Sequence, residues 1–404
     1  MRVGFGRECV NPPLGMAMEG LGQKTGIASI HDDLYVQALY LEDGAARVLI
    51  VGMDLLFFEM PVIERMKREV GSALALAPEA ILINTSHTHA GPRLTRWSYS
   101  GAPEAAYLDT AIAALVKAAK AAASKPVDAT MWAGTANTDL PVSRRKIDAN
   151  GKAQWAPNRS AEVCHALPFC LFRDGAGRVI SVLYSVSCHP SMVYSADASG
   201  DYVGAATRRL NAHFKTEGAI FLQGAGGDTK PRQIAVEEDH WRPATWDEVE
   251  AAGAEVAEAV IAAERAGVTR IEPALSTVTT VMDWTFERGP AEAELKALEA
   301  DPGVRPERRL WVQEMLSLYR ENGALPAAAP VTLHAIQMGG GLRLVGLAGE
   351  LVGELGNLVL RAYNKGITFP LGDTDGCVIY LPSDHMLPQG GYEVDSYWEY
   401  HWPA

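Results

Sequence analysis

The sequence predicts an α/β fold in which a layered, mixed β-sheet core is flanked by helices. The first observation is an alternation: the apolar run 47–53 is typical of a buried strand, 61–76 of an amphipathic helix and 80–83 of another strand. The second observation is that strand-like and helical runs continue along the chain. Such alternation is typical of domains in which helices cover a sheet. We expect one domain over residues 1–404, with a mostly helical covering region around 245–323.

The predicted strands differ in how deeply they are expected to be buried. Segment 32–40 alternates apolar and polar residues, whereas 47–53 is apolar and ends at Asp54. A carboxylate at the end of a buried strand needs a partner. Asp54 is therefore either a helix cap or an acceptor for an imidazole N–H. The remaining predicted strands are one within 9–15 that leads into a Pro/Gly turn, and those over 128–135, 178–187, 219–222, 274–284, 331–338, 342–347 and 377–382.

The predicted helices are marked by proline, by capping residues and by apolar residues at helical spacing. Pro61 opens the helix over 61–76, and Ser124-Lys125-Pro126 ends an alanine-rich helix that begins near residue 103. Thr245 and Glu248 match the capping-box pattern ahead of a long helix that reaches residue 266. The remaining predicted helices are one that follows 199–204 and runs through Leu210, and those over 308–321 and 351–362.

Composition disfavours several classes of partner. The chain has 404 residues, of which 48% are hydrophobic and 21% charged, as in a globular protein. Its net charge of −13 disfavours nucleic acid and anionic membrane surfaces, because both would be repelled. No apolar run approaches about 20 residues, so stable membrane insertion is not expected. Five cysteines without metal-type spacing and no evident signal peptide predict reduced thiols and a cytoplasmic location.

The stretch 80–92 carries the clearest candidate for chemistry. An apolar run ends in small polar residues and then in His87 and His89, which are followed by Gly91-Pro92. Side chains two residues apart in extended backbone point to the same side. Both imidazoles can therefore face one cavity and bind a metal or a substrate. The alternative is that both are surface histidines with satisfied hydrogen bonds.

Further chemistry-bearing residues are expected at the ends of other predicted strands. Strand 178–187 continues into His189-Pro190, and the proline fixes the direction in which the chain leaves the sheet. Glu350 is a carboxylate at the end of another strand. Tyr380 lies in the last predicted strand, and Tyr392 follows in a glycine-rich stretch. Taken singly, such tyrosines are usually packing residues.

Two stretches carry groups that can recognise a substrate. Arg144 and Arg145 lie in a cationic run after a proline, and Arg159 is a third candidate. Such residues either face solvent or hold an anion or a carbonyl oxygen. The short strand 219–222 opens into the loop 223–232, which lacks the spacing of a phosphate-binding loop. We interpret this segment as an active-site loop.

Together these elements resemble the neutral (alkaline, non-lysosomal) ceramidase family. The resemblance extends from near residue 9 to near residue 396 and implies a ceramidase-like catalytic domain. Its most specific element is the His-Thr-His-Ala-Gly-Pro sequence at 87–92. The full set of matching motifs is Asn11-Pro12-Pro13-Leu14-Gly15-Met16, His87-Thr88-His89-Ala90-Gly91-Pro92, Cys188-His189-Pro190, Gly227-Asp228, Gly349-Glu350, and Tyr380 with Tyr392.

The resemblance implies a zinc enzyme. In that family a zinc ion is bound by two histidines, a glutamate and a tyrosine, which correspond here to His87, His189, Glu350 and Tyr380. Nitrogen and oxygen ligands from several strand ends, with one position left for water, are typical of catalytic zinc sites. Zinc lowers the pKa of that water to about 7 and polarises a carbonyl, giving a hydroxide that can attack an amide carbon.

The resemblance also implies roles for residues around the zinc ion. His89, beside the metal, is expected to handle the proton and later to protonate the leaving amine. Tyr392 and one arginine are expected to hold the developing oxyanion. Arg144 is the preferred arginine, with Arg145 and Arg159 as alternatives.

Substrate contacts are expected from a glycine segment and from the active-site loop. The residues concerned are Gly20, within the segment 18–22, and Asp228, Thr229 and Lys230. Ceramidases carry a serine where this chain has Lys230. This lysine either points to solvent or attracts a carboxylate or phosphate. In the second case, substrates are expected to be shorter and more anionic than ceramide.

The expected activity is hydrolysis of a linear amide C–N bond in a small N-acyl or lipid-like molecule by zinc-bound hydroxide. An ester or lactone of a small soluble molecule is an alternative substrate for the same chemistry. A TIM-barrel amidohydrolase also carries His-x-His, but directly after its first strand and with a late aspartate, whereas here Glu350 is the late ligand. A non-catalytic metal-binding protein is expected to have a closed ligand set without the additional His89 and Tyr392.

Overall fold

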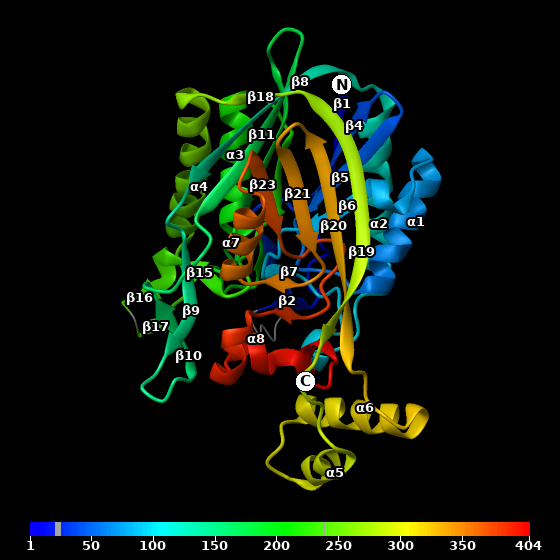
Figure 1. Cartoon of the computed structure of the whole chain (residues 1–404), viewed down its shortest axis with the longest axis vertical. Helices are drawn as coiled ribbons and strands as arrows, with labels where there is room; N and C mark the ends of the chain where they lie inside the picture. The colour runs from blue at the N-terminus through cyan, green and yellow to red at the C-terminus, as the bar shows by residue number, and fades with distance from the viewer. Residues whose placement is uncertain (21–25, 238) are drawn as a thin grey trace.

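A large mixed sheet forms the centre of the molecule, with helices on one face and a second sheet on the other (Figure 1). The computed structural model describes residues 1–20, 26–237 and 239–404. The predicted α/β class with flanking helices is therefore confirmed. The strands of the nine-stranded sheet, in spatial order, are β14 (Ala219–Gln223), β12 (Val179–Val186), β11 (Ala166–Asp174), β8 (Val127–Asn137), β1 (Arg2–Cys9), β4 (Tyr35–Asp43), β5 (Ala46–Met53) and β6 (Ile81–Thr85), with β18 (Thr269–Ile271) pairing β8.

A four-stranded sheet packs against the opposite face of the large sheet from the helices. Leu39, Ile50 and Leu183 of the large sheet belong to one buried cluster with Leu344 and Phe369 of the smaller one. All are completely buried, so this apolar layer joins the two sheets. The smaller sheet is ordered β19 (Pro273–Thr285), β20 (Ala328–Gly339), β21 (Leu342–Leu347) and β23 (Ile367–Leu371), and helix α7 (Gly353–Ala362) packs against β23.

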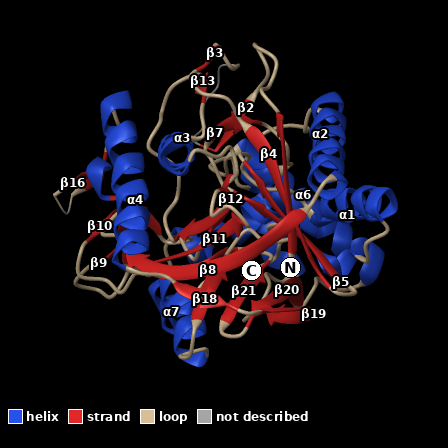
Figure 2. Cartoon of the chain, turned by 90° about the horizontal axis from the view of Figure 1, so that it is seen from above, coloured by secondary structure: helices blue, strands red, loops and turns tan. Residues whose placement is uncertain are grey.

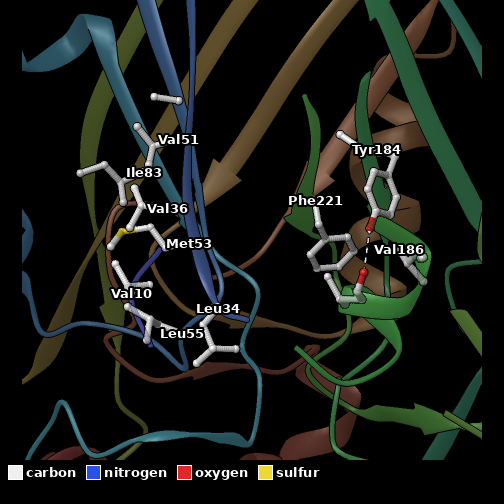
Figure 3. Packing of buried hydrophobic residues seen from close by; sticks show 14 of the residues in the cluster. Val10, Leu34, Val36, Val51, Met53, Leu55, Ile83, Tyr184, Val186 and Phe221 are labelled. Atoms are coloured by element: carbon white, nitrogen blue, oxygen red, sulfur yellow. Dashed lines mark hydrogen bonds between the residues drawn. The ribbon is translucent and has the colours of Figure 1, made fainter. Parts of the chain in front are cut away.

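Four helices cover the other face of the large sheet, in two pairs (Figure 2). Their buried residues join those of the sheet in the largest apolar cluster of the described residues. Figure 3 shows part of this cluster, with Val51 and Ile83 in one group of side chains and Tyr184 and Phe221 in another. The Tyr184 hydroxyl donates to the backbone carbonyl of Val203 at 3.2 Å, which ties a helix to the sheet. The helices are α1 (Met60–Leu74), α2 (Ala105–Ser124), α3 (Asp201–Phe214) and α4 (Trp246–Ala266).

Parallel strand pairs with a helical crossover occur three times in the described part of the chain. In each unit a helix follows one strand and returns the chain to a neighbouring strand that runs in the same direction. The carboxyl ends of both strands of a unit therefore lie at the same edge of their sheet, where ligands bind in open α/β sheets. The units are β5–α1–β6, β12–α3–β14 and β21–α7–β23.

Small sheets join the loops that follow these strand ends. The pairing of β2 with β7 sets Gly20 opposite Ala90, and the pairing of β22 with β24 sets Glu350 opposite Tyr380. The pairing of β9 with both β10 and β15 connects a hairpin to the predicted active-site loop. These strands are β2 (Met18–Gly20), β7 (Ala90–Pro92), β9 (Pro141–Ile147), β10 (Ala153–Asn158), β15 (Thr229–Pro231), β22 (Glu350–Leu351) and β24 (Tyr380–Leu381), and the remaining short elements are β3 (Ser29–Ile30), β13 (Asp197–Ala198), β16 (Ala235–Val236), β17 (His240–Trp241) and α8 (Tyr392–Asp395).

The predicted helical covering region around 245–323 separates into parts with different roles. Helix α4 covers the sheet beside α3 and begins with the predicted capping box, in which Thr245 and Glu248 satisfy each other's backbone N–H. Strands β18 and β19 interrupt the region, as expected for 274–284. Helices α5 (Glu292–Ala300) and α6 (Pro306–Asn322) pack against each other and project beyond the sheets (Figure 1). Trp311 of α6 donates to the carbonyl of Trp402 at 2.8 Å, which holds this helix against the C-terminal segment.

The sheet topology excludes the TIM-barrel alternative. Most neighbours in the large sheet are antiparallel, and its strands lie in an open order with β14 and β6 as the edges. A TIM barrel requires eight parallel strands that close on themselves. Within the described residues, no helix combines the length and the apolar character needed to cross a membrane.

The close packing of α2 on β1 depends on a glycine, which gives a first prediction. A Cβ atom at Gly6 would lie 2.1 Å from the carbonyl oxygen of Ala118 and 2.8 Å from the nitrogen of Ala122. Both are backbone atoms, so the helix would have to move away from the strand. We expect Gly6→Ala to lower the free energy of unfolding by about 1–3 kcal/mol in urea denaturation.

Gly175→Ala is the matched control for this prediction. A Cβ atom at Gly175, in the turn between β11 and β12, would meet no atom within 4 Å. An equal loss of stability in the two variants would contradict the packing argument for Gly6.

Candidate functional site

The ends of three strands from the three crossover units bring His87, His189 and Glu350 together. His87 follows β6, His189 follows β12, and Glu350 follows β21. Each side chain is only 2% exposed. The Nε2 atom of His189 lies 3.0 Å from Oε2 of Glu350, and Nε2 of His87 lies 3.5 Å from the same oxygen. Two imidazole nitrogens and a carboxylate oxygen thus converge on one point.

Each of these imidazoles is oriented by an acceptor on its other nitrogen. Nδ1 of His87 lies 3.2 Å from Oδ1 of Asp373, and Nδ1 of His189 lies 2.7 Å from the carbonyl oxygen of Gly226. With these partners Nδ1 carries a proton and donates, and Nε2 is the nitrogen of each ring that faces Glu350. Imidazoles held in this way by a carboxylate or a carbonyl are typical of metal sites.

Two tyrosines complete the surroundings of Glu350. Tyr380 stands opposite Glu350 in the pairing of β22 with β24, and its hydroxyl accepts a hydrogen bond of 2.9 Å from Nη2 of Arg144. The Tyr400 hydroxyl donates to Oε1 of Glu350. The four residues that the resemblance implies as metal ligands therefore lie together in the structure. Their donor set of nitrogen and oxygen atoms suits zinc.

The charges in this cluster shift the pKa values of its members. Burial by itself raises the pKa of Glu350, but the charges of His87, His189 and Arg144 outweigh burial and hold the pKa at about 2. Burial lowers the pKa of His189 to about 4, with a further contribution from Arg144. Burial also opposes a charge on His87, yet the carboxylates of Asp373 and Glu350 leave its pKa raised. Glu350 and His189 therefore have the protonation state that a metal ion requires, whereas His87 would have to give up a proton to bind one.

His89 lies beside this cluster without a partner of its own. Its ring centroid is 5.0 Å from that of His87 and 5.5 Å from that of His189. Neither ring nitrogen has a hydrogen-bond partner among the residues that the structure describes. Burial, followed by the charges on His87 and His189, lowers the pKa of His89 well below its usual value. The three histidines can also offer nitrogens that lie within 4.8 Å of one another, so His89 is able to approach a metal or to exchange a proton.

Gly20 closes one side of the site by direct approach to His89. Its φ of +123° lies in the region that favours glycine, and a Cβ atom there would stand 2.7 Å from Nδ1 of His89. The expected close approach of the backbone at Gly20 is thus made to a histidine of the site. Leu21 and Gly22, the rest of the predicted segment, lie outside the described residues.

The structure distinguishes among the three candidate arginines. Arg144 lines the site cavity, and its guanidinium donates to Oε1 of Glu393 at 2.6 Å. Arg145 donates to the other oxygen of Glu393 and to the carbonyl of Gly390, away from the cavity. Arg159 is exposed and donates to the carbonyl of Ala235. Of the three, Arg144 is therefore the one in a position to contact a substrate.

These residues surround a cavity of about 250 Å³. Its wall includes Tyr392, whose hydroxyl donates to Glu399 at 2.7 Å, and Trp155 from the β9–β10 hairpin. Lys230, from the predicted active-site loop, also lines the cavity and is 1% exposed, so it does not point to solvent. The complete lining is Gly20, Leu56, Phe57, His87, His89, Trp97, Arg144, Trp155, Ser191, Lys230, Glu350, Tyr380 and Tyr392.

Asp228 and Thr229, predicted to contact substrate, lie outside this cavity and support the loop instead. Oδ1 of Asp228 accepts a hydrogen bond of 2.8 Å from the backbone nitrogen of Gly353. The Thr229 hydroxyl donates to the carbonyl oxygens of Ser187 and Gly226. Their side chains are turned toward backbone because the loop is buried, and buried backbone groups need partners.

Asp54 does not accept a hydrogen bond from an imidazole of the described residues. Asp373 accepts one from His87 instead. Asp54 accepts a hydrogen bond from the backbone nitrogen of Tyr35 at 3.0 Å. Sequence reasoning missed Asp373 because Pro370 lies in the apolar run before it, and proline argues against a strand. Proline is tolerated here because β23 is an edge strand of the smaller sheet. The available signal was a short apolar run that ends in Gly-Asp.

Fold and site together define a mixed α/β protein with a buried histidine–carboxylate centre at the ends of its parallel strands. No protein-family model and no curated protein matches the sequence. Among solved structures, the neutral ceramidase from Pseudomonas aeruginosa matches with a TM-score of 0.75 and 15% identity, over 99% of this chain and 72% of that chain. A ceramidase complexed with C2 matches with a TM-score of 0.75 and 16% identity, over 99% and 73% of the two chains. The chain therefore has the fold of these ceramidases.

Removing Asp373 is expected to weaken metal binding. Its carboxylate orients His87 through Nδ1, and loss of such a partner typically costs about 10- to 100-fold in metal affinity. We expect Asp373→Ala to raise the dissociation constant for Zn²⁺ by that factor, measured by competition with a chromogenic chelator.

Asp54→Ala provides the control for this measurement, because the Asp54 carboxylate accepts its hydrogen bond from the Tyr35 backbone and not from an imidazole of the described residues. If Asp373→Ala bound zinc as tightly as the unaltered protein, the role of the His87–Asp373 contact in orienting a ligand would be refuted.

Proposed function

We propose that this protein is a zinc-dependent hydrolase that cleaves the linear amide bond of an N-acyl substrate. The observation that carries the proposal is the convergence of His87, His189 and Glu350 on one point inside a cavity. Two further observations support it: a histidine with free nitrogens lies beside that point, and an arginine and a tyrosine line the same cavity. The ceramidase fold supports the same reaction class.

The proposed zinc ligands are His87, His189, Glu350 and Tyr380. The ionised carboxylate of Glu350 and the neutral imidazole of His189 have the protonation that a divalent cation requires, and His87 would release its Nε2 proton to the cation. The hydroxyl of Tyr380 stays protonated, because burial and the neighbouring Glu350 raise its pKa even though Arg144 opposes them. When bound, zinc supplies Lewis-acid polarisation of a carbonyl and an acidified water.

His89 is proposed as the residue that moves protons. Its low pKa keeps the imidazole neutral, and its ring nitrogens are free of protein partners among the described residues. A neutral imidazole at the edge of the cavity can accept a proton from water and pass it to the leaving amine. The backbone at Gly20 approaches His89 so closely that a Cβ atom there would collide with it.

Arg144 and Tyr392 are proposed to hold the substrate carbonyl. Arg144 is anchored by Glu393 and by the carbonyl of Gly227, so its guanidinium is fixed at the cavity wall. Tyr392 lies 5.7 Å from Tyr380 between ring centroids, and its hydroxyl can turn from Glu399 to a substrate oxygen. Donors of this kind typically contribute about 3 kcal/mol each to stabilisation of a developing oxyanion.

The substrate panel that tests the proposal contains N-acyl amines, N-acyl amino acids, a short-chain ceramide, simple esters and a lactone. Hydrolysis of an amide by the zinc-loaded protein, abolished by a chelator and restored by zinc, is the expected result. Hydrolysis of the esters or the lactone alone would replace the amidase assignment with that of an esterase or lactonase.

His189→Ala should lose both metal and activity. The substitution removes a ligand nitrogen and leaves Glu350 as a buried carboxylate without one of its partners. We expect about one zinc per chain in the unaltered protein and substoichiometric zinc in the variant, by elemental analysis. Full zinc content in a folded His189→Ala protein would show that the ligand set is assigned incorrectly.

His89→Ala should have the opposite pattern, with zinc retained and turnover reduced by about 100-fold or more. The reason is that His89 handles protons but contributes no ligand in the proposed arrangement. Zinc content and kcat are measured on the same preparation. Stoichiometric loss of zinc would instead identify His89 as a ligand, which the proximity of the three histidines also permits.

A further inference from the structure

The cavity contains a buried cation without a carboxylate partner. Lys230 is 1% exposed, and its Nζ atom donates a hydrogen bond of 3.2 Å to the Tyr194 hydroxyl. Within the described residues, no carboxylate oxygen lies within 4.0 Å of that nitrogen. Aromatic rings surround it instead, with centroids 5.5 Å away in Tyr194 and 5.9 Å away in Trp155 and Trp241.

The other buried cations among the described residues contact a carboxylate. Arg144 and Arg145 each donate to one oxygen of Glu393 at 2.6 Å, and the partly buried Lys67 lies 2.6 Å from Oδ2 of Asp375. Buried charges are expensive unless paired, and cation–π contacts offset only part of that cost. The contrast indicates that Lys230 is maintained for a counter-ion that the protein itself does not supply.

Lys230 lies in the wall of the site cavity, where a bound substrate could supply the missing counter-ion. Lys230 lines the same cavity as His87, His89 and Glu350. Trp155 is shared by two cations, with the Arg144 guanidinium 4.6 Å and Lys230 Nζ 5.9 Å from its ring. Arg144 is held by Glu393, so Lys230 is the cation of this cavity wall that has no carboxylate contact among the described residues.

The surroundings of Lys230 also lower the pKa of its ammonium group. Burial, followed by the charge of Arg144, lowers the pKa of Lys230 to about 7. An anion in the cavity would favour the protonated form, so binding an anion relieves part of the cost of burying the ammonium.

We propose that Lys230 forms an anion subsite in this cavity and that the substrates are small N-acyl compounds that carry a carboxylate. The proposal rests on the proposed amidase function and names the substrate class for it. A carboxylate fits better than a phosphate because one ammonium group balances one negative charge, and Arg144 is proposed to hold the substrate carbonyl instead. The cavity volume of about 250 Å³ lies below the usual range of about 300–1,000 Å³ for ligand pockets, which favours a small substrate.

The test compares matched substrates that differ only in charge. One pair places the charge on the amine portion: N-hexanoylglycine and N-hexanoylglycinamide. The other pair places it on the acyl portion: N-propylsuccinamate and N-propylsuccinamide. N-hexanoylethanolamine and its phosphate form a third pair. For each pair, kcat and KM are measured with the zinc-loaded full chain.

We expect the carboxylate to be preferred over its amide by about tenfold or more in kcat/KM in at least one of the first two pairs, mainly through KM, as for a charge-assisted contact. In Lys230→Met this ratio should fall to about one, and in Lys230→Arg it should be largely retained, because the charge remains. The quantity compared is the ratio of kcat/KM for the carboxylate to kcat/KM for its amide within one variant. A substitution that changes the activity toward both substrates equally leaves this ratio unchanged. Lys125→Met, at an exposed lysine just after α2, is the control with the same change in net charge.

Several results would overturn the proposal. Equal use of the charged and neutral members of both carboxylate pairs by the unaltered protein would do so, as would a preference for the carboxylate that survives in a folded Lys230→Met protein. A stronger preference for the phosphate than for either carboxylate would contradict the assigned substrate class.

Failure of the amidase function itself is distinguishable from failure of the subsite. If no amide in the panel is hydrolysed, the proposed function is wrong, and the same pairs are then compared by calorimetric binding. Binding of a carboxylate but not of its amide, lost in Lys230→Met, would support the anion subsite independently of catalysis. Absence of any difference in binding would overturn it.

Discussion

The buried carboxylate of Glu350 is the group on which the site depends. It is 2% exposed, lies against the imidazoles of His87 and His189, and accepts a hydrogen bond from the Tyr400 hydroxyl. A charge so far from water is stable only when its partners are in place. Because these partners follow different strands and the C-terminal segment, the sheets, the crossovers and the chain end must assemble before the site exists. The same arrangement gives a divalent cation a ready set of donors.

Charge is distributed differently in the whole chain and in the cavity. The protein has a net charge of −13, which describes how it meets large charged partners in solution. Inside the cavity the balance is local: Glu350 faces histidines, Glu393 is shared by Arg144 and Arg145, and the described residues in contact with the Lys230 ammonium are aromatic rings and a hydroxyl. The acidic composition of the chain therefore does not exclude an anionic substrate, because a buried cation acts at short range in a low dielectric.

Sequence patterns predicted the parts of the site that follow continuous apolar runs. His87 and His189 each come after a clear strand, and the chain segment between the strands of each unit is recognisably helical. The patterns failed where local rules were overridden by position in the fold. The strand before Asp373 was not predicted because it contains Pro370. Proline is acceptable there because this strand lies at the edge of the smaller sheet. Asp54 follows a strand of the same kind as β6, yet it bonds to backbone near Tyr35.

The sequence by itself determined the class of fold, the residues that end its strands and the chemistry these residues can perform, because periodicity and residue type are local properties. Only the tertiary structure decided which of them meet. It selected Arg144 over Arg145 and turned Lys230 into the cavity rather than toward solvent. The physical reason is that distance and burial depend on how separate strands pair, and no local pattern specifies the partner that a buried charge will find.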